Sequence, residues 1–262
     1  METKIIKQII RVGNSSGVLL PRRWYGGEVR IELVERPTNI KKDILEILDT
    51  FLSDISGIYL VGSYARNEQT KNSDIDILVI TSDINKNIKK GKYEITLMSK
   101  KNIERQLKEN LLPILPWLIE AKPILNKELI ENYKKTQLTK KNLKWHIDTT
   151  KSAMRVVKED IKLSEQFSEI KMMNASAYSL ILRLRTLYII DCLKKKKLWK
   201  KKEFLDLVES ISGSLNVYKI YIDIKNKNKS ENNLSIKEAK KLVDYITKEI
   251  IEVEKWVKEK KD

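Results

Sequence analysis

The sequence predicts an α+β protein with three parts: a short N-terminal β-hairpin segment, a small mixed-sheet domain and an all-α C-terminal bundle. Three patterns predict this fold class. Residues 1–36 combine β-branched residues with glycine turns, residues 40–128 mix helical and strand-like spacing, and residues 137–262 keep helical spacing throughout. We place the domain boundaries at 1–37, 38–130 and 137–262.

The N-terminal segment has the pattern of short β-strands. Glycine-containing turns at residues 13–17 and 26–27 separate apolar stretches at 18–20 and 29–33. Strands this short cannot bury a core by themselves. We therefore expect the segment to pack on the rest of the chain or on a second copy, and we expect a homodimer.

The middle region mixes amphipathic helices with short apolar strands. Pro113 should end or kink a helix that precedes it, and Pro116 and Pro123 should interrupt any further helix before residue 128. The expected elements are a helix at 40–52, strands at 58–61, 75–80 and 93–98, and a helix at 102–112.

The C-terminal region is predicted to be entirely helical. Ser235 and Glu238 form a capping box, which marks the start of the last helix. The expected helices are 141–166, 175–193, 202–211, 214–226 and 235–260.

The chain is strongly basic, with 52 Lys and Arg against 36 Asp and Glu, a formal net charge of +16. The excess is uneven, because residues 41–100 carry nine of each sign whereas residues 141–262 carry 28 basic and 18 acidic residues. A basic surface around a carboxylate-bearing middle suits a polyanion such as a nucleotide or nucleic acid. A Lys-rich composition with Lys and Glu on solvated helix faces would give the same excess.

Several classes of protein are excluded by residue counts. Cys192 is the only cysteine and His146 the only histidine, which excludes a disulfide framework, Cys-rich zinc sites and multi-histidine metal sites. We expect His146 to be structural. The sequence holds no apolar stretch long enough to span a membrane and no secretory signal, so we expect a cytoplasmic location.

The informative stretch begins where an apolar strand ends in Gly62-Ser63. Ten residues later, Asp74 and Asp76 open the next strand. Side chains two apart on a strand point the same way, so both carboxylates face one side. Paired carboxylates suit a hard divalent cation that keeps positions free for phosphate oxygens, and Gly62 lets the backbone approach a phosphate closely.

This stretch resembles the polymerase-beta-like nucleotidyltransferase superfamily, and closely its minimal nucleotidyltransferase branch. The resemblance implies a small mixed sheet backed by helices, and transfer of a nucleoside monophosphate from an NTP, with ATP the expected donor, to a hydroxyl. It also implies that Asp74 and Asp76 are catalytic and hold Mg²⁺ or Mn²⁺, while Gly62 and Ser63 bind the triphosphate. Arg66 is either a further nucleotide contact or an exposed cap of the motif helix.

The family resemblance also implies a third carboxylate on the neighbouring strand, where Glu94 has the right phase. Glu94 would complete the metal site or act as the base that takes the acceptor proton. The alternative is a solvent-facing strand residue.

Two shorter resemblances concern the ends of the chain. Residues 11–24 resemble the AbrB/MazE-type swapped hairpin, which implies a dimer and candidate DNA contacts at Arg11, Arg22 and Arg23. The helical region weakly resembles HEPN-like domains. Its Arg183 and Arg185 lack the histidine that follows in RNA-cleaving members, so RNase activity is not expected.

Two functions are therefore open. The first is a Mg²⁺-dependent nucleotidyltransferase whose acceptor is a protein, a small molecule or RNA, in a toxin–antitoxin-type system by analogy. The second is a dimeric DNA-binding regulator that uses residues 1–36 and carries a sensory or inactive nucleotidyltransferase domain.

Overall fold

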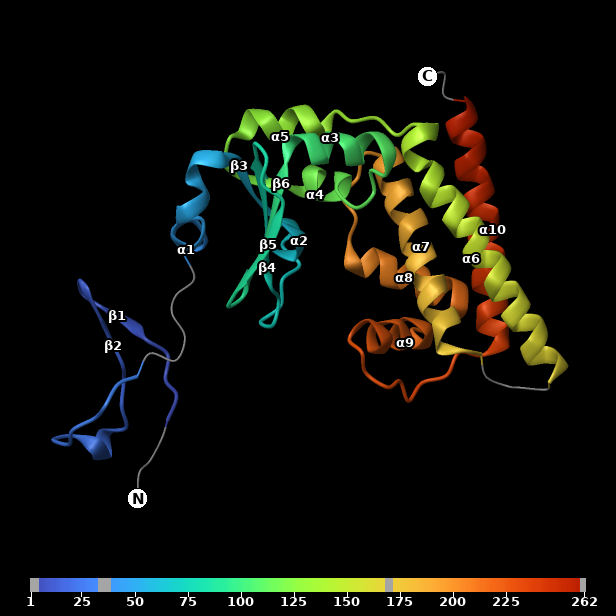
Figure 1. The fold of residues 1–262 in the computed structure, drawn as a ribbon. Helices are drawn as coiled ribbons and strands as arrows, with labels where there is room; N and C mark the ends of the chain where they lie inside the picture. The colour runs from blue at the N-terminus through green and yellow to red at the C-terminus, as the bar shows by residue number, and fades with distance from the viewer. Residues whose placement is uncertain (1–4, 33–38, 168–171, 260–262) are drawn as a thin grey trace. The chain divides into compact units, whose positions relative to one another are not determined.

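The fold is taken from a computed structural model, which describes residues 5–32, 39–167 and 172–259 (Figure 1). The chain divides into two units, residues 1–43 and 44–262. The domain boundary predicted at residues 37 and 38 lies outside the described residues.

The N-terminal unit contains one small hairpin. Strands β1 (Ile10–Val12) and β2 (Ser15–Gly17) pair antiparallel, and Gly13 closes the turn with φ +57°. A 3₁₀ turn, η1 (Arg22–Trp24), follows. The strand character expected at residues 18–20 and in the described part of 29–33 is wrong, because these stretches have no hydrogen-bonded partner in the described chain.

Apolar side chains of this unit are largely exposed. They are Ile5, Ile6, Ile9, Ile10, Val12, Leu19, Leu20, Val29 and Ile31. The unit therefore has no core of its own, as its short strands predicted.

Helix α1 (Ile40–Ile47) is shorter than the predicted helix at 40–52. The chain tightens after it into a 3₁₀ segment, η2 (Asp49–Asp54), in which the Phe51 N–H bonds to the Leu48 carbonyl at 2.8 Å. Asp, Thr and Ser are weak helix formers, which explains why the α-helix ends where they gather.

A mixed five-stranded sheet is the centre of the second unit. Its strand order is β5-β6-β4-β3-β7, in which β4 and β6 run parallel and the other neighbours antiparallel. The strands are β3 (Ile55–Val61), β4 (Ile75–Thr81), β5 (Lys86–Lys90), β6 (Tyr93–Ser99) and β7 (Lys122–Leu125). The mixed α+β class is thus confirmed.

The two outer strands were not predicted. Strand β5 is rich in lysine and mostly exposed, and β7 contains Pro123. Lysine and proline are typical of edge strands, which have one free side and need no continuous apolar pattern.

Four helices accompany the sheet: α2 (Gly62–Arg66), α3 (Lys100–Glu109), α4 (Leu115–Glu120) and α5 (Lys127–Lys134). Helix α3 starts two residues before the predicted helix at 102–112 because Ser99 caps it, accepting from the Asn102 N–H at 3.3 Å. Pro116 lies in the first turn of α4, where the missing N–H costs nothing.

The remaining helices follow the sequence prediction within two residues at each described end. They are α6 (Lys140–Gln166), α7 (Asn174–Lys194), α8 (Lys201–Ser212), α9 (Asn216–Lys225) and α10 (Ile236–Glu259). The predicted capping box is confirmed, since the Glu238 N–H bonds to Ser235 Oγ and the Ser235 N–H bonds to Glu238 Oε2, both at 3.2 Å.

Helices α6, α7 and α10 pack together as the main body of the helical part (Figure 1). Ion pairs Lys151–Glu254 and Lys240–Glu165 join α6 to α10. The later residue of α6 pairs with the earlier residue of α10, so the two helices run antiparallel. Among the described residues, no helix has both the length and the apolar character to cross a membrane.

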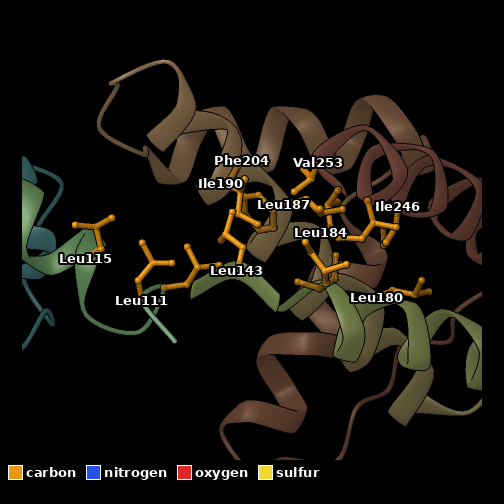
Figure 2. Packing of buried hydrophobic residues seen from close by; sticks show 14 of the residues in the cluster. Leu111, Leu115, Leu143, Leu180, Leu184, Leu187, Ile190, Phe204, Ile246 and Val253 are labelled. Carbon is orange, nitrogen blue, oxygen red and sulfur yellow. The ribbon is translucent and has the colours of Figure 1, made fainter. Parts of the chain in front are cut away.

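One continuous apolar core extends from the sheet into the helices. Figure 2 shows the part of it that leads from Leu111 and Leu115 into the helical part. It includes Tyr59 and Leu78 of the sheet, Leu111 before α4, and Leu184 and Ile246 of the helical part. The predicted division into a sheet domain and a helical domain stays a prediction, but its two parts share this core.

Truncation of a core leucine should destabilise the protein far more than truncation of a surface leucine. Leu184 of α7 is fully buried, whereas Leu163 of α6 is 52% exposed. We expect Leu184→Ala to lower the free energy of unfolding by about 3 kcal/mol, because a cavity remains. Leu163→Ala should stay within about 0.5 kcal/mol. Urea unfolding of both variants measures the difference, and equal losses would show that α7 does not pack as described.

Candidate active site

The Gly62-Ser63 turn lies where β3 ends and α2 begins. Gly62 has φ +70°, in the left-handed region, and a Cβ atom at this position would collide with the Asp76 carboxylate and lie 2.8 Å from its Cγ. Only glycine both adopts this positive φ readily and leaves space for the Asp76 carboxylate. The turn is therefore in direct contact with the second carboxylate of the motif.

Asp76 lies between two neighbours across the sheet. Its Cα pairs with Val61 of β3 on one side and with Glu94 of β6 on the other. Asp74 directly precedes β4 and is exposed, as is Glu94, while Asp76 is half-buried. The structure thus brings together Gly62, the two aspartates and Glu94.

The three carboxylates act on one another. Burial first, and then the charges of Glu94 and Asp74, raise the pKa of Asp76 to about 6, although Arg66 and Lys225 lower it in part. Crowded carboxylates whose charges oppose one another fit a hard divalent cation, which would relieve the repulsion. The donor set therefore fits Mg²⁺ or Mn²⁺.

Glu94 also has a partner on the sheet edge. Lys89 of β5 lies opposite Glu94 in the register, and its Nζ contacts Glu94 Oε1 at 2.5 Å. Within the described ranges, no three acidic, histidine or cysteine side chains converge closely enough to hold a metal as they stand. A cation shared by Glu94, Asp74 and Asp76 would therefore require these carboxylates to move closer together.

A buried glutamate that sequence reasoning missed holds the motif turn. Glu120, at the end of α4, has a fully buried side chain. Its Oε1 accepts from the Gly62 N–H and its Oε2 from Arg66 Nη1, both at 2.6 Å. Burial raises the pKa of Glu120, and Arg66 opposes the rise. The sequence feature that could have revealed Glu120 is an acidic residue at the end of the otherwise apolar run Leu-Pro-Trp-Leu-Ile-Glu.

Arg66 is engaged on several sides. Besides Glu120, its Nε bonds to Glu68 Oε2 at 2.9 Å, and its guanidinium lies 3.9 Å from the centroid of the Trp199 ring. Its side chain is 9% exposed, so the alternative of an exposed cap is wrong. Its role as a nucleotide contact stays a prediction.

The helical part reaches the motif through the connection between α7 and α8. Trp199 lies against Arg66 and also within 5.1 Å of the Arg185 guanidinium, and the Lys201 N–H donates to Glu68 Oε1 at 3.0 Å. The charge of Lys225, at the end of α9, acts on Asp76. Sequence reasoning did not single out Trp199 or Lys225, because both come from segments far from the motif.

The remaining candidate residues belong to other elements of the chain. His146 is buried in α6, and its predicted structural role stays a prediction. In the N-terminal unit, Arg11 Nε bonds to the Gly13 carbonyl at 3.1 Å, and Arg22 and Arg23 are exposed. DNA binding by these three arginines stays a prediction.

Removal of the Glu120 charge should destabilise the fold. In Glu120→Gln, Arg66 keeps its buried charge but loses a full partner, which should cost about 3 kcal/mol of unfolding free energy. The exposed Glu128 in α5 supplies the control, since Glu128→Gln should change stability by less than about 0.5 kcal/mol. Chemical denaturation decides, and a Glu120→Gln variant as stable as its control would contradict this role.

Comparison with known proteins agrees with this geometry. The family model described as nucleotidyltransferase domain matches residues 41–262, which include the whole site. Among curated proteins, no match is found.

Two solved structures are similar to the chain. One is a nucleotidyltransferase-like protein from Exiguobacterium sibiricum, 16% identical, with a TM-score of 0.38 over 82% of this chain and 75% of the other. The second is a spectinomycin adenyltransferase from Enterococcus faecialis with ATP and spectinomycin, 15% identical, with a TM-score of 0.38 over 82% of this chain and 100% of the other. Because the family match covers most of the sequence, the chain belongs to the nucleotidyltransferase domain family.

Proposed function

We propose that this nucleotidyltransferase transfers a nucleoside monophosphate from an NTP, with ATP as the expected donor, to an acceptor hydroxyl, and that it depends on Mg²⁺ or Mn²⁺. The observation that carries the proposal is the contact between the Gly62 turn and Asp76, with Glu94 beside Asp76 in the sheet register. A phosphate-binding turn and a set of crowded carboxylates are thereby joined in one place.

Each residue then has a distinct task. Asp74 and Asp76 would hold the divalent cation, which when bound neutralises phosphate charge and favours in-line displacement. Gly62 and Ser63 would hold the triphosphate. Glu94 would either complete the cation site or take the proton from the acceptor hydroxyl, and Lys89 holds its carboxylate in place until then.

Lys225 is a further candidate for the donor site. Its positive charge acts on Asp76 from α9, which belongs to the helical part. A cation close enough to act on Asp76 would also attract the phosphates of the donor. We propose that Lys225 contacts the triphosphate.

The acceptor is proposed only as a class. A protein hydroxyl, a small molecule and an RNA end all offer the nucleophile that the transfer needs. The spectinomycin adenyltransferase among the similar structures is an example of an enzyme with a small-molecule acceptor. A toxin–antitoxin context rests on the AbrB-like and HEPN-like resemblances and stays a prediction.

The N-terminal unit supports a second element of the proposal. Its apolar side chains are exposed within the described residues, and a 43-residue unit without a core needs a partner surface. We propose that a second copy of the chain supplies this surface in a homodimer. The alternative function, a DNA-binding regulator, would also require such a homodimer.

Loss of one motif carboxylate should abolish transfer. We expect Asp76→Asn to lower the rate by more than about 100-fold, since even groups outside the metal ligands contribute 10–100-fold. The assay uses α-³²P-labelled NTPs with Mg²⁺ and with lysate separated into protein, RNA and small-molecule fractions. Asp83→Asn, an exposed aspartate beyond the other end of β4, is the matched control. Transfer that Asp76→Asn retains in full would overturn the proposed site.

Lys225→Gln should weaken donor binding rather than chemistry. We expect KM for the NTP to rise about tenfold, equivalent to about 1.4 kcal/mol, with KM for the acceptor unchanged. Lys219→Gln, an exposed lysine on the same helix, should leave both constants unchanged. Steady-state kinetics on the labelled acceptor fraction would test this, and an unchanged KM for the NTP in Lys225→Gln would exclude the triphosphate contact.

A further inference from the structure

A second group of polar side chains meets inside the helical part, on α6 and α7. His146, Thr149 and Thr150 lie three and four residues apart, so they share one face of α6. Arg183 of α7 joins them, because its Nη1 donates to Thr149 Oγ1 at 3.1 Å. We call these four residues the α6–α7 polar cluster.

Three atoms of the cluster are buried without a hydrogen-bond partner among the described residues. They are His146 Nε2, Thr150 Oγ1 and Arg183 Nε. His146 is 5% exposed and Thr150 is fully buried. Each buried polar atom left unpaired costs free energy, so three in one place indicate a binding partner that completes them.

The charge of the cluster is also uncompensated within the described residues. Burial is the cause that lowers the pKa of Arg183, with no carboxylate acting on it. The acids of the neighbouring turns are already paired with lysines: Asp148 with Lys144, Asp191 with Lys195, and Glu254 with Lys151. The partner that fits is therefore negatively charged, since water would fill the hydrogen bonds but leave the charge.

His146 agrees with an anionic partner. Burial and the Arg183 charge lower the pKa of His146 to about 4, so the ring is neutral near pH 7 and can donate from Nε2. Arg183 is half-buried, and the 51% exposed Trp145 lies edge-on to His146 with ring centroids 5.0 Å apart. The cluster is thus buried at its base but close to the surface.

We propose that the α6–α7 polar cluster is a binding site for a phosphate group. Its oxygens would accept from Arg183 Nε, Thr150 Oγ1 and His146 Nε2, the three atoms of the cluster that have no partner among the described residues. The phosphate is either free phosphate or the phosphate of a nucleotide or nucleic acid, and both sources present the same oxygens. The site is formed by residues of α6 and α7 alone and does not rest on the proposed transferase activity.

The single histidine of the chain makes the test specific. With ¹⁵N-labelled histidine, the imidazole resonances of the full-length protein report on His146 alone. Inorganic phosphate, AMP and a short single-stranded RNA are titrated separately at pH 7, with chloride keeping the ionic strength constant. We expect a saturable shift of the His146 signal, with Kd of about 1 mM or tighter for at least one probe.

Variants separate a built site from general attraction to a basic protein. Arg183→Gln should remove the saturable shift, whereas Arg155→Gln, an exposed arginine of α6, should retain it. Thr150→Val keeps the side-chain shape, removes one unpaired oxygen and should weaken binding at least threefold. The Thr150→Val variant can test the site even if Arg183→Gln does not fold. Asp76→Asn should bind the probes as the unaltered chain does.

The outcomes distinguish the sources and the alternatives. Binding of inorganic phosphate as tight as that of RNA indicates free phosphate, and tighter binding of AMP or RNA indicates a nucleotide phosphate. A shift that is absent, fails to saturate with every probe, or is unchanged in both Arg183→Gln and Thr150→Val would overturn the proposal and leave a water-filled cluster.

Discussion

The motif turn depends on the buried carboxylate of Glu120. Its two oxygens accept from the Gly62 N–H and from Arg66, and its side chain is fully buried. A buried carboxylate that has lost its hydration needs such donors. Loss of either hydrogen bond would therefore lower the stability of the fold. The same two bonds fix where β3 ends and α2 begins. They thereby hold the Gly62 backbone against Asp76, and the carboxylate set takes its geometry from a residue that belongs to none of the motif strands.

The site holds carboxylates that repel one another and cations that reduce this repulsion. Asp76 lies near Asp74 and Glu94, and burial first and then the charges of these two carboxylates raise its pKa. Three cations from different elements, Lys89, Arg66 and Lys225, reduce this repulsion. A net charge of +16 is therefore not only a property of solvated helix faces, since part of it is placed around the acidic patch of the motif. This arrangement would favour the approach of the anionic triphosphate in the proposed reaction, because cations offset part of the carboxylate charge.

Much of this architecture was predictable from the sequence, and the failures share a physical cause. Central strands such as β4 are buried on both faces, so their apolar runs are visible in the residues. The long helices keep an apolar period over many turns. Strands β5 and β7 have no such pattern, because an edge strand forms by pairing with one neighbouring strand and does not need a continuous apolar run. Glu120 and Trp199 were missed for the same reason. Each acts on the site through its contact with Arg66, and the spacing of residues along the sequence does not reveal a contact between distant segments.

The helical part is in direct contact with the motif. Trp199 packs on Arg66, and the Lys201 N–H bonds to Glu68, which itself pairs with Arg66. Arg66 then bonds to Glu120, so a chain of contacts leads from the α7–α8 connection to the Gly62 turn. The shared apolar core joins the two parts as well, because helix α3 beside the sheet packs against α6 of the helical part. The nucleotidyltransferase family model likewise matches both the sheet and the helices, over residues 41–262.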